Sequence, residues 1–244
     1  MNKKNEKNSI NRRQPIWKCV ASVLRLFMKK PKIISLSGEL PNKAIYVANH
    51  SAMFGPVIYN LYLPAKVAPW GAYPMLGNYR ERFTYLRDVY FMQKRHKSKA
   101  TATFLAGFEA LFSKCFYRGL NVLPSYNDSR FITTIRKSLQ ALEQDVGVLI
   151  FPEDSSSGYH EVLTRFFAGF VELAKCFRLR HYEDVPIYPV YYHDKKRVMV
   201  IGNPSKLTDY TDKGMNRHQI ADDFCNQVNE LFLKYIKGAE PQNA

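Results

Sequence analysis

The pair Asn49-His50 directly follows the apolar run IYVA at 45–48, which predicts a short buried strand. A helix is expected to begin soon afterwards, with Pro56 in its first turn. This pattern puts His50 at a strand-to-helix turn, where its ring can face a ligand. An imidazole with an ordinary pKa near 6.5 is largely neutral at pH 7, so His50 is a candidate general base. The alternative is a structural histidine held by a hydrogen bond.

A second predicted strand, GVLI at 147–150, ends at Phe151-Pro152-Glu153-Asp154. Its wholly apolar composition is typical of a strand buried inside a parallel sheet. In such sheets, ligand sites gather beyond the carboxyl ends of the strands. We therefore expect Glu153 and Asp154 to share a cleft with His50. The alternative is that the two carboxylates cap a turn or a helix.

These two strand ends require a sheet to position them. Apolar strand patterns alternate with helical patterns along the chain, which predicts an α/β fold: a mixed, mostly parallel central sheet with helices on both faces. Strands are predicted at 32–38, 44–48, 119–124, 147–152, 185–192 and 197–202. Helices are predicted at 57–63, 78–88, 101–116, 128–144, 163–177 and 217–236, and the Pro- and Gly-rich segment 65–77 is predicted to be a loop.

Residues 1–32 form a separate basic region ahead of the predicted α/β domain, which spans 33–244. They carry ten basic residues and a single acid. One helical face is predicted to hold the apolar side chains Ile16, Val20, Val23, Leu24 and Phe27. With Trp17 and flanking lysines, this face suits the headgroup region of an anionic membrane. The alternative is a helix packed against its own domain.

The whole chain of 244 residues has a formal net charge of +15, which indicates an anionic partner. Nucleic acid, anionic lipid, a phosphorylated substrate and an acidic carrier protein all fit that charge. The basic segment QKRHKSK at 93–99 fits the same partners or a solvated loop. No apolar run reaches the length of a spanning helix. The four cysteines are isolated, which predicts free thiols and no metal site.

Four motifs in a fixed order resemble the lysophospholipid (glycerolipid) acyltransferase superfamily. They are Asn49-His50, the FPE of 151–153, GFVELAK at 169–175 and VPIYPV at 185–190. The resemblance spans about Ile45 to Pro204. Family members move a fatty acyl chain from a coenzyme A or acyl-carrier-protein thioester to a glycerolipid hydroxyl.

The resemblance implies that His50 is the base acting on the acceptor hydroxyl, and that Asn49 and Glu153 belong to the substrate site. It implies acyl-CoA or acyl-carrier protein as cosubstrate, with no bound cofactor. The implied partners are a lysophospholipid and an anionic membrane surface, not nucleic acid. The expected location is the cytoplasmic face of the membrane, as a peripheral or monotopic protein.

The sequence departs from the family motifs at three places. Gly55 stands where N-H-x4-D has the aspartate that orients the histidine. Asp154 replaces the glycine of F-P-E-G-T-R, and the stretch after Gly119 lacks the family arginine. The nearest cations, Arg118 and Arg130, are candidate phosphate contacts.

Loss of an orienting aspartate costs about 10⁴ in rate in the serine-protease triad. The hypothesis is that Asp154, or else Glu153, orients the His50 ring in place of the missing aspartate. A second use of Gly55 is to let a ligand approach the backbone N–H groups at the helix start. The rival functions are a catalytically impaired lipid-binding relative and a basic nucleic-acid-binding protein.

Overall fold

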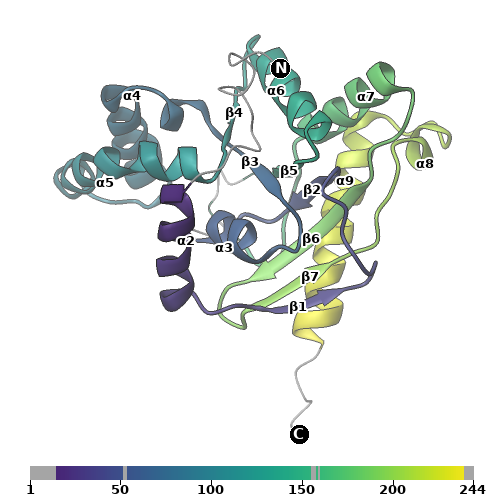
Figure 1. The fold of residues 1–244 in the computed structure, drawn as a ribbon, viewed down its shortest axis with the longest axis horizontal. Helices are drawn as coiled ribbons and strands as arrows, with labels where there is room; N and C mark the ends of the chain where they lie inside the picture. Colours follow the sequence, from purple (N-terminus) through teal and green to yellow (C-terminus); the bar gives the residue numbers. More distant parts are fainter. Residues whose placement is uncertain (1–14, 52–53, 155–157, 159, 239–244) are drawn as a thin grey trace, which may run out of the picture.

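A computed structural model of the chain describes residues 15–51, 54–154, 158 and 160–238. A seven-stranded sheet forms its centre, in the order β1-β7-β6-β2-β5-β3-β4 (Figure 1). The strands are β1 (Lys32–Ser35), β2 (Ile45–Ala48), β3 (Val67–Ala72), β4 (Leu123–Ser125), β5 (Gly147–Ile150), β6 (Ile187–His193) and β7 (Val198–Ile201). Of the six pairings between neighbouring strands in the described part of the chain, five are parallel and the β6–β7 pairing is antiparallel. The predicted mixed, mostly parallel α/β fold is confirmed.

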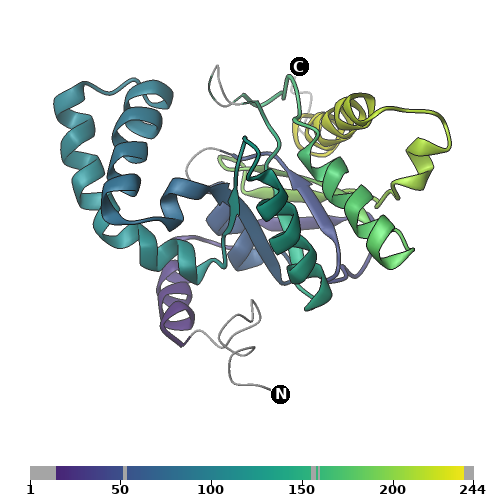
Figure 2. The ribbon, with the colours of Figure 1, turned by 90° about the horizontal axis from the view of Figure 1, so that it is seen from above.

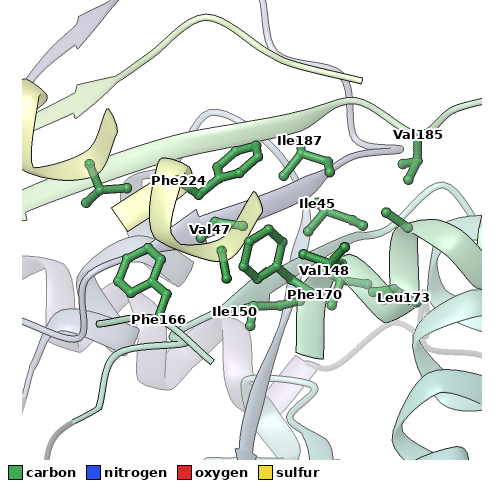
Figure 3. Packing of buried hydrophobic residues seen from close by; sticks show 14 of the residues in the cluster. Ile45, Val47, Val148, Ile150, Phe166, Phe170, Leu173, Val185, Ile187 and Phe224 are labelled. Atoms are coloured by element: carbon green, nitrogen blue, oxygen red, sulfur yellow. The ribbon is translucent and has the colours of Figure 1, made fainter. Parts of the chain in front are cut away.

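The two faces of the sheet are buried under different helices. Alternate residues of β2 and β5 point to opposite faces, as Ile45 and Tyr46 do. One face packs against α6 (Phe131–Glu143), α7 (Gly169–His181) and α9 (Arg217–Phe232), and Figure 3 shows Phe170 and Phe224 within this core. The other face packs against α3 (Gly55–Tyr62). The short helix α8 (Thr208–Thr211) and the π-helical turn η3 (Leu233–Lys237) complete the C-terminal part.

A helical lobe between β3 and β4 projects from one side of the sheet (Figure 2). It consists of the 3₁₀ turn η1 (Tyr73–Leu76), α4 (Tyr79–Thr84), the π-helix η2 (Tyr85–Lys94) and α5 (Lys99–Gly119). Side-chain caps begin two of its helices, because Asn78 and Glu81 form a capping box and Ser98 accepts from the N–H of Thr101. Small residues at every fourth position of α5, Ala102, Ala106 and Ala110, let it pack closely in the lobe.

The segment 65–77 is not the predicted loop, because it contains the interior strand β3. Its prolines suggested a break in structure. The strand tolerates Pro69 because it pairs with β5 over Val67–Pro69 and with β4 over Trp70–Ala72, so the proline ends one ladder before the next begins. The prediction of a loop is wrong, because local composition does not show which backbone groups of a segment will pair with neighbouring strands.

The helix predicted at 163–177 begins later, at Gly169. The preceding residues pair instead with the chain that follows β5. The N–H of Asp154 donates to the carbonyl of Arg165, and the N–H of Phe167 donates to Pro152. Because the backbone of 165–167 is used in this antiparallel contact, it cannot also start the helix.

The N-terminal helix α2 (Pro15–Phe27) packs on α3 and α5 through Trp17, Ala21 and Leu24. Leu24 therefore belongs to a packed face, as the alternative interpretation of this segment expected. Val23 and Phe27, on the neighbouring face, remain exposed. The basic tail at 1–14 and the side chain of Ile16 lie outside the described residues. Within the described ranges, helices with the length and apolar content to cross a bilayer are absent.

Candidate functional site

The two strand ends singled out in the sequence lie side by side. Strands β2 and β5 are parallel neighbours, and Val47 pairs with Ile150. His50 and Glu153 each stand three residues beyond that pair, so they leave the sheet at the same level. The sequence predicted this meeting of strand ends, and the register of the sheet confirms it.

Glu153 joins the two loops by a hydrogen bond to the backbone. Its carboxylate accepts from the N–H of His50, with 3.1 Å between Oε2 and N. A further bond comes from the backbone of His160. Burial raises the pKa of Glu153, and the two backbone bonds and the charges of His160 and Lys94 act in the opposite direction. Glu153 therefore fixes the backbone position of His50 and brings negative charge to the site.

Asn49 holds the end of β2 against β6. Its side-chain nitrogen donates to the carbonyl of Tyr192 at 3.0 Å, and its oxygen accepts from the N–H of the same residue at 2.8 Å. The hydroxyl of Tyr59 donates to that oxygen as well, at 2.8 Å. The buried amide thus continues the β2–β6 ladder beyond its last backbone pair. These bonds explain the asparagine structurally, and its predicted contact with substrate stays a prediction.

Two aromatic residues form a wall beside the histidine. The ring of Phe151 meets the ring of His50 edge-on, with centroids 5.2 Å apart. Tyr59 packs against Phe151 from α3, with centroids 5.7 Å apart. Burial raises the pKa of Tyr59, which keeps its hydroxyl neutral and able to donate to Asn49. Tyr59 was not among the predicted site residues, because a tyrosine in an apolar helix carries no distinguishing pattern.

Gly55 is enclosed by the backbone of the same turn. A Cβ atom at this position would lie 1.9 Å from the carbonyl oxygen of His50. Such a distance is far below van der Waals contact, so no side chain fits without movement of the turn. This backbone leaves no room for an orienting aspartate at position 55. The sequence predicted that the missing side chain of Gly55 would let a ligand approach the backbone. On the side where a Cβ atom would lie, that space is occupied by the carbonyl group of His50.

Lys94 brings a cation to the two carboxylates, which the sequence did not indicate. It is the last residue of η2 and is half-buried. Burial lowers the pKa of Lys94, and the charges of Glu153 and Asp154 act in the opposite direction. Lys94 lies in the basic segment 93–99, in which all seven residues are polar. The sequence of this segment therefore does not distinguish Lys94 from the neighbouring lysines as a site residue. A π-helix ending at this residue is a rare feature that often occurs at functional sites.

Asp154 lies next to Glu153 at the end of β5, half-buried, with its backbone tied to Arg165. Its charge acts on Lys94. The residue is thus in the same charged group as Glu153, as predicted. Its role in orienting the ring of His50 stays a prediction.

The two arginines that are candidate phosphate contacts lie on different parts of the molecule. Arg130 pairs with Asp128 at 2.6 Å, and its guanidinium lies over the rings of Tyr73 and Tyr126. The charge of Arg130 is paired with Asp128, and its guanidinium group is stacked on two tyrosine rings. Arg130 therefore holds the loop after β4 in place. Arg118 is exposed in the last turn of α5. Phosphate binding by either arginine stays a prediction, and the charges of Glu153 and Asp154 act on Lys94.

A pocket of about 410 Å³ opens beside this group. Its lining comes from β3, the ends of β4 and β5 and the starts of α6 and α7, and includes Trp70, Phe131, Phe151 and Phe170. Phe151 thus borders both His50 and the pocket. The volume and apolar lining are typical of a small-molecule site.

A larger groove of about 720 Å³ lies between α7, α8 and α9 and contains none of the predicted site residues.

No protein-family model, curated protein or solved structure matches this chain. The assignment of the site therefore depends on its own residues and geometry.

Gly55→Ala is expected to destabilise the fold by about 1–3 kcal/mol, because the added methyl group overlaps the carbonyl of His50. Gly107→Ala is the matched control: its nearest neighbour would be 3.9 Å away, and alanine favours the helical conformation. Urea unfolding of both variants measures the difference. Equal stability of the two variants would contradict the close contact at position 55.

Proposed function

We propose that this protein is an O-acyltransferase of the glycerolipid type. It moves a fatty acyl group from an acyl-CoA or acyl-carrier-protein thioester to the hydroxyl of a lysoglycerolipid. The observation that supports this proposal best is the placement of His50 and Glu153 at neighbouring strand ends beside an apolar pocket, with the charge of Lys94 acting on Glu153 from the end of η2. The ordered motifs of the sequence support the same assignment.

In the proposed reaction, the neutral ring of His50 removes the proton of the acceptor hydroxyl. The hydroxyl oxygen attacks the thioester carbonyl, and the carbonyl oxygen takes up negative charge in the tetrahedral intermediate. The intermediate then breaks its carbon–sulfur bond. The leaving thiolate takes the proton from His50, which gives a free thiol and a new ester. Glu153 keeps the backbone of His50 in place throughout this sequence.

Two features are assigned to substrate binding. The pocket bordered by Phe151 has an apolar lining that suits part of the acyl chain. Lys94 is assigned to the anionic headgroup of the acceptor, because its charge interacts with both carboxylates at the end of β5. Its half-buried position favours a strong interaction with a phosphate, since the surrounding protein screens charge less than water does.

The acceptor lipid places the proposed reaction at an anionic membrane, on its cytoplasmic face. The basic N-terminal region supports this location.

A lipid-binding relative without catalytic activity is the second candidate function. The packing of Gly55 favours it, because the backbone excludes an orienting carboxylate at that position.

His50→Ala is expected to lower acceptor-dependent thiol release by about 10²–10⁴-fold, the usual contribution of a general base. Release is measured from acyl-CoA and acyl-carrier protein with lysophosphatidate as acceptor. His96→Ala, an exposed histidine in the basic segment, is the control and keeps wild-type rates. Absence of release by the wild type with either donor would favour the lipid-binding relative.

Lys94→Gln is expected to raise the KM for lysophosphatidate at least about tenfold, since a charged hydrogen bond contributes about 1.5–3 kcal/mol. The KM for the acyl donor should change little. Lys97→Gln removes an exposed charge three residues away and serves as the control. Equal effects of the two substitutions would show that Lys94 acts only through the general basic charge of the segment.

Asp154→Asn is expected to lower kcat by about 10²–10⁴-fold if Asp154 orients His50. Loss of a carboxylate beside an imidazole lowers the pKa of the ring, so the pH–rate profile of the variant should also shift to lower pH. Unfolding in urea separates this effect from a loss of structure. A decrease of only a few-fold with an unchanged pH profile would rule out an orienting role.

A further inference from the structure

The helix α5 carries a row of large apolar side chains on its exposed face. We call this row, Phe104, Phe108, Leu111 and Phe112, the aromatic ridge. The exposed fractions are 78% for Phe104, 66% for Phe108 and 61% for each of the other two. Spacings of three and four residues put all of them on one side of the helix. A contiguous apolar row of this kind on a surface usually marks an interaction site.

The ridge is not needed for packing inside the lobe. The opposite side of α5 packs against the lobe through small residues, among them Ala102, Ala106 and Ser113. The rings of Phe108 and Phe112 contact each other, with centroids 5.3 Å apart, and still leave most of their surface in water. Burial of such rings outside the lobe is a source of binding free energy.

A second apolar surface lies on α2, which touches the end of α5. Trp17 packs edge-on against Phe116, with centroids 5.5 Å apart. Beyond this contact, Val23, Leu26 and Phe27 of α2 are exposed. The two helices that meet at Trp17 thus both present apolar side chains to the outside.

Basic residues border these apolar surfaces. The turn before α5 exposes Arg95 and Lys97, and the helix itself begins with the exposed Lys99. Arg118 continues the line of the ridge at its other end. The only carboxylate within α5, Glu109, is half-buried, and burial raises its pKa. On and directly after α2, the exposed bases are Lys18, Arg25, Lys29 and Lys30.

We propose that the aromatic ridge and the exposed face of α2 dock onto an anionic lipid bilayer. Aromatic side chains flanked by bases are the pattern of a helix that lies in the headgroup region. A second copy of the chain is a poorer occupant, because it would bring bases at both ends of the ridge against like charges. Nucleic acid would use the bases and leave the phenylalanines unburied.

The same lobe links this surface to the candidate site. Lys94 ends η2 immediately before the basic turn that begins α5. Docking of the ridge would therefore hold the segment that carries the site cation at the bilayer. The inference extends the proposed membrane partner and does not depend on acyl transfer, because binding and turnover are measured separately.

The first experiment measures sedimentation of the full chain with vesicles of phosphatidylcholine alone or mixed with phosphatidylglycerol. Phe104→Ser/Phe108→Ser is expected to lower the partition coefficient for the anionic vesicles at least about tenfold. Ile132→Ser/Leu179→Ser is the matched control, because both side chains are 68% exposed on other helices. The control should bind like the wild type. Equal binding by the ridge variant, or no binding by the wild type, would overturn the proposal.

A second variant tests the contact directly and does not depend on loss of binding. In Phe108→Trp, the added indole should be quenched by brominated phosphatidylcholine in anionic vesicles, relative to the wild-type signal. Ile132→Trp should show no added quenching. Absence of quenching at position 108 would overturn the proposal. A dimer that the ridge substitutions convert to a monomer, with unchanged vesicle binding, would also overturn it and indicate an interface between copies.

Discussion

The parallel pairing of β2 with β5 is the constraint on which the candidate site depends. Val47 and Ile150 are partners, so the residues that follow leave the sheet together. A shift of either strand by one residue would turn its buried side chains to the opposite face. Both faces are covered by helices, so such a shift would disrupt two cores at once. The hydrophobic cores thereby hold His50 and Glu153 at one level.

Burial and charge act against each other at the end of β5. Burial raises the pKa of Glu153 and lowers that of Lys94, and each effect favours the neutral form of its group. Their mutual attraction favours the charged forms. The backbone N–H of His50 adds a hydrogen bond to the carboxylate. A half-buried group of this kind can respond to the charge of a bound substrate, because little bulk water screens it.

The backbone around His50 leaves little free space. Ser51 adopts a positive φ of 45°, and Gly55 approaches the carbonyl of His50 closely. Asn49 ties the start of the turn to β6, and Tyr59 ties it to α3. The position of His50 is thus set by backbone contacts on several sides. The ring itself faces Phe151, an apolar neighbour that borders the pocket.

The amino-acid sequence alone predicts the alternation of strands and helices, the apolar strand at 147–150 and the pair of strand ends that carry His50 and Glu153. Apolar periodicity is a local property, so these features can be predicted without a fold. The tertiary structure alone decided that the Pro-containing segment 67–72 is an interior strand, because strand pairing can accommodate a proline that local rules treat as a breaker.

The tertiary structure also decided which charged residues share the site. Lys94 and Glu153 are far apart in the chain and are brought together by the lobe inserted after β3. Arg130, which precedes a helix in an exposed loop, is instead paired with Asp128. Contacts between distant segments depend on how the helices and strands pack together. Such contacts cannot be predicted from the local pattern of residue types. The sequence therefore predicts that the histidine and the carboxylates lie close together, and the packed fold adds Lys94 beside the carboxylates.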